Sequence, residues 1–253
     1  MKKKSYLIIL IILACTQLTG CSYFPQIEDF SKVISGEASQ EAKVLENELQ
    51  QMREEVADYF YYQQLDTDEE RRVYLQLANG LRTFKQQITI DRVDDETYTR
   101  AFFSVANDFP EYYWMTDAMR DGIDYQDLSE PDYPLQVEEE SEKIATLAQS
   151  IVSQAPKDHV YDTVKFFYEY IIQHTDYNLA ALSDSQISWD NQSIKSVLLD
   201  NSSVCAGYSR TFQYLCKLAG IESVYVSGNV TGTNGETIEH AWNLVKIDQQ
   251  YYG

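Results

Sequence analysis

Cys205 and His240 are the two residues whose side chains could together carry out nucleophilic chemistry. A cysteine thiolate attacks carbonyl carbon readily, and an imidazole can take up the thiol proton and later give it to a leaving group. Such a pair suits acyl transfer, in which a thioester forms and then passes to an amine or to water. Because an isolated cysteine and histidine are weak evidence, the prediction depends on the elements that hold them.

A helix predicted over residues 204–219 would place Cys205 in its first turn. Aromatic and small apolar residues recur at helical spacing along this segment: Tyr208, Phe212, Leu215 and Ala219. The polar residues 201–203 could cap its start, and Gly220 suits its end. A helix start carries unpaired N–H groups and partial positive charge. We therefore expect a lowered pKa for the Cys205 thiol and a place for an oxyanion.

Two strands are expected to follow this helix and to carry His240 toward the thiol. Val224–Val226 reads as the first strand, and Ile238–Ile247 as the second, with His240 near its start. The segment between them contains Gly232 and Gly235, which are typical of a hairpin turn. The order of helix, hairpin and strand can therefore place an imidazole against the thiol.

The predicted helix argues against a disulfide between Cys205 and Cys216. On a helix their separation would be roughly 16 Å, whereas a disulfide requires Cα atoms within ~7 Å. Cys216 is therefore expected to be a core thiol that packs beside Leu215 and Leu218. A metal site made by Cys205, Cys216 and His240 is not expected, because the two sulfurs would point from distant helix turns.

Four short motifs around these residues resemble the bacterial transglutaminase-like superfamily. They are Val-Cys-Ala-Gly-Tyr-Ser at 204–209, Ala-Gly-Ile at 219–221, Val-Ser-Gly at 226–228 and His-Ala-Trp-Asn-Leu-Val at 240–245. The resemblance covers roughly residues 160–253, with Thr-Asp-Tyr at 175–177 as a weaker upstream element. It implies an α+β fold with a papain-like core of helices on a small antiparallel sheet. It also implies Cys205 and His240 as the catalytic pair and no cofactor.

The sequence departs from the family pattern in two ways. The family's third catalytic residue is an aspartate on the strand after the histidine strand, and this sequence ends at Gly253 before such a residue. Asp248 falls in an expected turn and is no substitute, so we expect a chain truncated near an incomplete triad. The second departure is Ser203, which stands where the family often has glycine and is expected to tighten the entrance to the site.

The N-terminal segment resembles a bacterial lipoprotein signal. It consists of the basic residues 2–4, the apolar run 6–14 and the sequence Leu-Thr-Gly directly before Cys21. The apolar run is too short to span a bilayer, which needs about 20 residues. We expect cleavage after residue 20, lipidation of Cys21, and a lipid-anchored protein on the extracellular side of the cell membrane. An ordinary secretory signal with an incidental cysteine is the alternative.

Composition indicates a globular protein and excludes one class of partner. Hydrophobic residues make up 44% of the 253 residues, which is enough for a core. The 20 basic and 40 acidic residues give a formal charge of -20. This charge repels phosphates and argues against nucleic acid as a partner. It also argues against adhesion to anionic lipid unless the chain carries an anchor.

Periodicity and turn residues divide the chain into four predicted parts. These are the signal peptide at 1–20, a tether at 21–40, a mainly helical region at 41–133 and an incomplete transglutaminase-like domain at 134–253. The helical region begins with one apolar face, formed by Leu45, Leu49, Met52, Val56 and Tyr59. Thr67 and Glu70 fit a capping box for its next helix.

The function expected from the sequence is extracellular cysteine-dependent acyl transfer on amide or peptide carbonyls, as in a transglutaminase, deamidase or protease. Its substrate would be a protein or peptide, including peptides of the cell wall, and the sequence does not distinguish an amine from a water acceptor. The alternative is a catalytically inactive transglutaminase-like surface lipoprotein that binds cell-wall or protein ligands.

Overall fold

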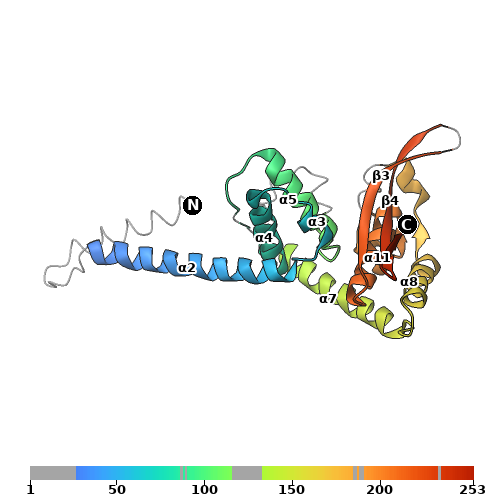
Figure 1. Ribbon diagram of the computed structural model, residues 1–253, viewed down its shortest axis with the longest axis horizontal. Coiled ribbons are helices and arrows are strands. Elements are labelled where there is room, and N and C mark those ends of the chain that lie inside the picture. The colour runs from blue at the N-terminus through green and yellow to red at the C-terminus, as the bar shows by residue number, and fades with distance from the viewer. Residues whose placement is uncertain are drawn as a thin grey trace. The chain divides into compact units, whose positions relative to one another are not determined.

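A computed structural model describes residues 27–85, 88, 90–115, 133–184, 187, 191–232 and 235–253. The chain divides into two compact units, Met1–Asn47 and Glu48–Gly253. Figure 1 shows the helices and strands in their order along the chain. The described part is mostly helical with a small antiparallel sheet, which confirms the predicted α+β class. The predicted signal peptide, Cys21 and residues 116–132 lie outside the described residues. The predicted division at residue 134 stays a prediction.

Helix α2 spans Ile27–Glu55 and starts earlier than the sequence pattern predicted. Its C-terminal part carries the expected apolar face, since Leu49 and Met52 are buried. Residues 27–40 are helical too, although their lack of an apolar period indicated an irregular tether. The physical reason is that extending an existing helix requires no new nucleus, so the segment needs no apolar period of its own.

Three shorter helices follow in the second unit: α3 (Phe60–Gln63), α4 (Asp68–Arg82) and α5 (Asp95–Asp108). The predicted capping box of α4 is confirmed. The Thr67 hydroxyl accepts a hydrogen bond from the Glu70 N–H at 3.1 Å, and the Glu70 carboxylate accepts one from the Thr67 N–H at 3.0 Å. Helices α4 and α5 pack together and bury Val73 and Val105 between them.

Asp108, at the end of α5, places a buried carboxylate at the start of α3. The carboxylate accepts hydrogen bonds from the N–H groups of Tyr61 and Tyr62, at 3.0 and 2.9 Å. It also accepts one from the Tyr74 hydroxyl at 2.8 Å. Burial raises the pKa of Asp108 to about 6, against the opposing effect of these hydrogen bonds.

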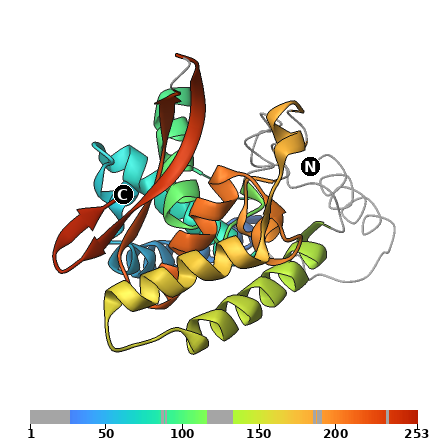
Figure 2. The ribbon, with the colours of Figure 1, turned by 90° about the vertical axis from the view of Figure 1, so that its right-hand side faces the viewer.

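The rest of the second unit surrounds one helix. Its elements are α7 (Tyr133–Gln154), α8 (Val160–His174), η1 (Leu179–Leu182), α10 (Ile194–Leu198), α11 (Cys205–Leu218), β3 (Ser223–Thr231), β4 (Thr237–Ile247) and β5 (Gln250–Tyr252). Helix α11 contacts α7 and α8 on one side and β3 and β4 on the other (Figure 2). The helix predicted at 204–219 is therefore confirmed, and it lies at the centre of this part of the fold.

The sheet has the order β3-β4-β5, and both of its pairings are antiparallel. The register of β3 and β4 places Tyr225 opposite Asn243 and Gly228 opposite His240. The expected turn after β4 is present, with positive φ angles of 49° at Asp248 and 69° at Gln249. Within the described residues, the structure has no helix long and apolar enough to cross a membrane.

Candidate active site

Cys205 is the first residue of α11, and its side chain is partly exposed. The predicted cap by residues 201–203 is wrong, because the N-cap is Val204, whose side chain makes no capping hydrogen bond. The physical reason is that the backbone enters the helix one residue later than those polar side chains. The N-cap side chain therefore does not occupy the N–H groups of the first turn.

Ser203 holds the segment that leads into the first turn of α11. It is fully buried, and its hydroxyl bonds to the Asn191 carbonyl at 2.8 Å and to the Ser196 hydroxyl at 2.7 Å. A Cβ atom at Gly207 would collide with the Ser203 hydroxyl, so glycine at 207 permits this close approach. The expectation that Ser203 tightens the entrance is therefore wrong, because this side chain is an internal anchor.

A short parallel strand pair holds Tyr177 beside the thiol. Strand β1 (Asp176–Tyr177) pairs with β2 (Ser202–Ser203), which leads into α11. Burial raises the pKa of Tyr177, and the charge of the neighbouring Cys205 thiolate raises it further. The Tyr177 ring, which is 44% exposed, lies 6.0 Å from the Tyr208 ring. The weak upstream element of the sequence thus supplies a polar hydroxyl next to the candidate nucleophile.

His240 lies on β4, and its side chain is exposed. Its neighbour Ala241 is buried with Ala206 and Tyr225 in the small cluster against which Cys205 packs. The structure therefore brings the backbone beside His240 close to the thiol. The His240 ring stacks near that of Trp242, with 6.3 Å between the ring centroids and 28° between the planes.

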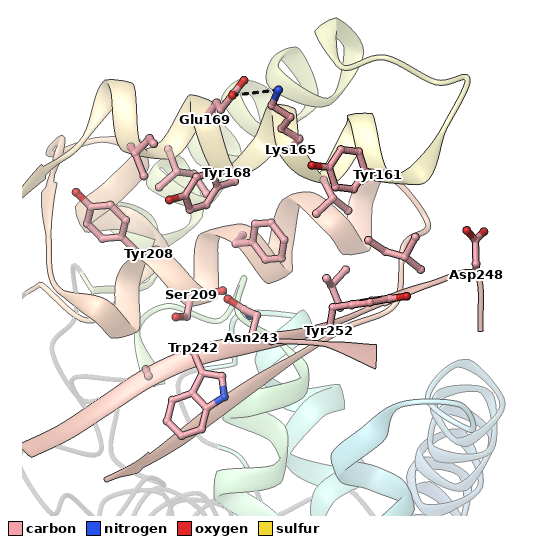
Figure 3. Close-up of a pocket in the computed structure, with 18 residues that line it drawn as sticks. Tyr161, Lys165, Tyr168, Glu169, Tyr208, Ser209, Trp242, Asn243, Asp248 and Tyr252 are labelled. Carbon is pink, nitrogen blue, oxygen red and sulfur yellow. Dashed lines mark hydrogen bonds and ion pairs between the residues drawn. The ribbon is translucent and has the colours of Figure 1, made fainter. Parts of the chain in front are cut away.

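The structure does not join the two candidate catalytic side chains directly. Successive side chains of a strand point to opposite faces, and Asn243 faces α11, where its amide donates to the Ser209 carbonyl at 3.0 Å. His240 and Trp242 therefore project from the other side of β4, as Figure 3 shows for Trp242. Within the described residues no hydrogen bond joins the Cys205 thiol to the His240 ring. Because such bonds often form only with substrate bound, the catalytic roles of both residues stay predictions.

An apolar groove of about 960 Å³ begins next to this site (Figure 3). It runs between α8 and the strands β4 and β5, over the outer side of α11. Tyr208, Ser209 and Ala241 line it, and each of them lies on α11 close to Cys205 or on the strand beside it. Farther along, its lining is mostly aromatic and aliphatic, with the Lys165–Glu169 ion pair at 3.6 Å.

Cys216 has the opposite character from Cys205. Its side chain is 0% exposed, and burial raises the pKa of its thiol. Both thiols are free, and both belong to α11, so the predicted core position of Cys216 is confirmed. In the ranges that the structure describes, no three or more histidine, cysteine or carboxylate side chains are arranged to hold a metal ion.

Two residues near the thiol were missed by the sequence analysis. Tyr225 is buried beside Cys205, and the Arg210 guanidinium carbon lies 4.2 Å from the centroid of the Tyr225 ring. Arg210 also donates a hydrogen bond to the Ala106 carbonyl at 2.5 Å. An arginine in a helix between Tyr208 and Phe212 was a visible signal. Its partners, however, lie far away in the sequence, where no local pattern points to them.

Comparison with known proteins gives a family match in the C-terminal part of the chain, together with curated relatives and solved structures. A family model described as the transglutaminase-like superfamily matches residues 145–253. Human kyphoscoliosis peptidase is 26% identical over 152 residues, which cover 56% of this chain and 22% of the human protein. The mouse protein is 25% identical over 115 residues, which cover 42% of this chain and 16% of the mouse protein. The chain thus spans about a fifth of the length of these relatives.

Solved structures to which the chain is similar include a TGase and a candidate cysteine protease from Cytophaga hutchinsonii. The first has a TM-score of 0.39 at 18% identity and covers 55% of this chain and 36% of its own. The second has a TM-score of 0.34 at 19% identity and covers 44% and 35%. The family match itself includes the start of α11 and the strand that carries His240. Residues 145–253, which make up less than half of the chain, are therefore similar to the transglutaminase-like superfamily.

Proposed function

We propose that this domain catalyses cysteine-dependent acyl transfer on carboxamide or peptide carbonyls outside the cell, with Cys205 as nucleophile and His240 as base and acid. The observation that carries the proposal is the position of Cys205 at the open start of α11, within the matched domain. The N-terminal charge of the helix favours a thiolate there, and the open N–H groups can bind the oxyanion of a tetrahedral intermediate.

The reaction would proceed in two halves. The Cys205 thiolate attacks the carbonyl carbon, the C–N bond breaks, and the leaving amine takes a proton from the His240 imidazolium. A thioester remains on Cys205. A second amine or a water molecule then gives a proton to His240 and attacks the thioester, and the thiolate leaves. An amine acceptor gives cross-linking, and water gives deamidation or peptide hydrolysis.

The groove beside the site supports a protein or peptide substrate. Its aromatic and aliphatic lining can receive apolar side chains next to the reacting carbonyl. Tyr177, exposed at the thiol, is a hydroxyl that could contact the substrate carbonyl region. Peptides of the cell wall and surface proteins both present amide carbonyls of this kind.

The test compares four variants of the full chain. Cys205→Ser and His240→Asn remove the proposed groups, while Cys216→Ala and His159→Asn are matched controls outside the site. Each protein is incubated with glutamine-containing peptides and a labelled amine, and mass spectrometry follows amine incorporation, deamidation and cleavage. We expect the first two variants to lose at least about 100-fold in rate and the controls to keep theirs. Activity that survives Cys205→Ser would refute the proposal.

The second candidate is a domain that binds ligands without turning them over. It is favoured by the exposed His240 ring and by the lack of a thiol–imidazole hydrogen bond among the described residues. In that case peptides would bind the groove, and Cys205→Ser would leave their affinity unchanged. Calorimetry with cell-wall peptides, together with the activity assay, separates the two functions.

We also propose that Cys21 anchors the protein to the outer face of the cell membrane through a lipid. The supporting observations are the basic and short apolar segments before Leu-Thr-Gly-Cys21. In a bacterial host, Cys21→Ala should release the protein to the medium or leave the precursor uncleaved. Cys15→Ala is the matched control, because it removes a thiol from the same segment. Normal processing and membrane retention of Cys21→Ala would contradict the anchor.

A further inference from the structure

Arg210 connects α11 to the helical region that precedes the transglutaminase-like domain. Its two terminal nitrogens donate to the Ala106 carbonyl at 2.5 Å and to the Asn107 side-chain oxygen at 3.2 Å. Both acceptors belong to the last turn of α5. The guanidinium is therefore fixed from one side by a neighbouring helix, with the planar geometry that arginine, unlike lysine, can use for two directed bonds.

The face of the same guanidinium holds the Tyr225 ring. The guanidinium carbon lies 4.2 Å from the ring centroid, which is within the range of a cation–π contact. The backbone of Tyr225 is held independently, because its carbonyl accepts a hydrogen bond from the Tyr61 hydroxyl at 2.5 Å. Tyr225 is only 5% exposed, and it belongs to the cluster against which Cys205 packs.

The positive charge of Arg210 has no carboxylate partner within the described residues. Its hydrogen bonds all go to neutral oxygens, and burial lowers its pKa. Arg210 lies five residues after Cys205 on one helix, which is roughly 7.5 Å along the axis. The Tyr225 side chain interacts with both groups: burial raises its pKa, the charge of Arg210 at its ring lowers that pKa, and a charge at Cys205 raises it. Tyr225 therefore links the guanidinium to the cluster at the start of the helix, against which Cys205 packs.

From this arrangement we propose that Arg210 is a positioning residue for Cys205. Clamped by the last turn of α5, it holds the Tyr225 ring against the first turn of α11 and supplies an unneutralised positive charge that favours the Cys205 thiolate. The helical region thus contributes to the reactivity of a thiol in the next part of the chain. The catalytic value of this effect rests on the proposed acyl transfer, but the effect on the thiol can be measured without any substrate.

The measurement is the pH dependence of Cys205 alkylation by iodoacetamide in the folded full chain, read by peptide mass mapping. Arg210→Met removes the charge and keeps most of the length. We expect its alkylation midpoint to rise by about half a pH unit to one unit, and labelling near neutral pH to fall about threefold to tenfold. An unchanged midpoint in the folded variant would overturn the proposal.

Asn107→Asp is the second variant, chosen because it keeps the clamp. A carboxylate in place of this amide would still accept from Arg210, and it would neutralise the guanidinium without removing it or its contact with Tyr225. A purely structural role predicts no change in the alkylation midpoint for this variant. Our proposal predicts a rise similar to that of Arg210→Met, so this variant decides the question if Arg210→Met does not fold.

Arg82→Met is the matched control, since it removes an arginine whose partner is Glu55 at 2.9 Å, far from the thiol in the sequence and on other helices. We expect an unchanged Cys205 midpoint for it, and a rise equal to that of Arg210→Met would overturn the proposal. If the wild type proves inactive in every acyl-transfer assay while these midpoints shift as expected, the proposed function fails and the role of Arg210 stands.

Discussion

The two ends of α11 carry the same functional group in opposite surroundings. At the first turn, Cys205 is partly exposed next to Tyr177, and the N-cap residue supplies no side-chain acceptor. Near the last turn, Cys216 is 0% exposed, and burial raises the pKa of its thiol. Because both residues are cysteines on one helix, we expect the position on the helix and the degree of burial to decide which of them reacts.

In the last turn of α11, the positive charge of Lys217 is compensated by a neighbouring carboxylate. The Lys217 ammonium donates to the Glu111 carboxylate at 2.7 Å and to the Asp108 carbonyl at 3.3 Å. Burial disfavours its charged form, but Glu111 and Tyr59 act the other way, and the pKa of Lys217 is raised. An ion-paired, partly buried lysine thus lies at one end of α11, and a partly exposed cysteine lies at the other.

The largest effect is expected when an aspartate replaces each of the two cysteines of α11 in turn. Cys216→Asp would bury a carboxylate without a partner, and we expect it to lower the free energy of unfolding by about 3–5 kcal/mol. Cys205→Asp places the charge at a helix start, where it should cost nothing or stabilise by about 0.3–1 kcal/mol. Urea denaturation of both variants measures the difference. Similar losses at the two positions would contradict the comparison.

The second prediction concerns Asp108, whose backbone carbonyl accepts a hydrogen bond from Lys217. Burial raises the pKa of Asp108 from its ordinary value of 3.8 to about 6, so the native state binds this proton more tightly than the unfolded chain. The stabilisation of the native state by this proton is fully present below about pH 4. It is lost as the pH rises through 6, which lowers the free energy of unfolding by about 3 kcal/mol. Unfolding free energies of the wild type and Asp108→Asn, measured from pH 4 to 7, isolate it. A constant difference between the two proteins would show that Asp108 does not titrate in this way.

The third prediction concerns the reactivity of the two thiols. In the folded protein, iodoacetamide near neutral pH should label Cys205 at least about 100-fold faster than Cys216, because only Cys205 combines exposure with a helix start. In concentrated urea the two rates should become equal, which is the internal control. Equal rates in the native protein would contradict the difference described above between the two ends of α11.

The smallest expected effect tests whether the stability of the whole helical region affects the reactivity of Cys205. Thr67→Ala removes the capping hydrogen bond of α4, and we expect a loss of about 1 kcal/mol in unfolding free energy. The labelling rate of Cys205 in the folded state should not change, because α4 is not part of the Arg210 clamp. Thermal unfolding and alkylation of the same sample check both statements. A slower labelling of Cys205 would mean that the site depends on the stability of the whole helical region.

Local patterns in the sequence were enough to predict the helix that carries Cys205 and the hairpin that carries His240. The apolar spacing of Tyr208, Phe212 and Leu215 predicted α11, and the glycines near 232–235 predicted the hairpin of β3 and β4. Both signals are short-range, because they arise from helical periodicity and from turn conformations of neighbouring residues. The capping box at Thr67 was predicted for the same reason.

The contacts that complete the site could not be predicted in this way. The clamp on Tyr225 needs Arg210, Ala106 and Tyr61, and the buried role of Ser203 depends on Asn191 and Ser196. Each is a tertiary contact between segments that show no pattern of their own. The side of β4 from which His240 projects followed only from knowing that Asn243 faces α11.

The long-range bonds at α11 also have a consequence for folding. Arg210, Gln213 and Lys217 reach residues of the chain that lie 104, 106 and 109 positions earlier. Contacts that close such large loops form slowly, since their conformational entropy is lost before the contacts reward it. We expect a chain that is still folding to carry an ordinary thiol at Cys205. The surroundings that set its reactivity would then form only when α5 and α11 have met, which delays the nucleophile until the rest of the fold is in place.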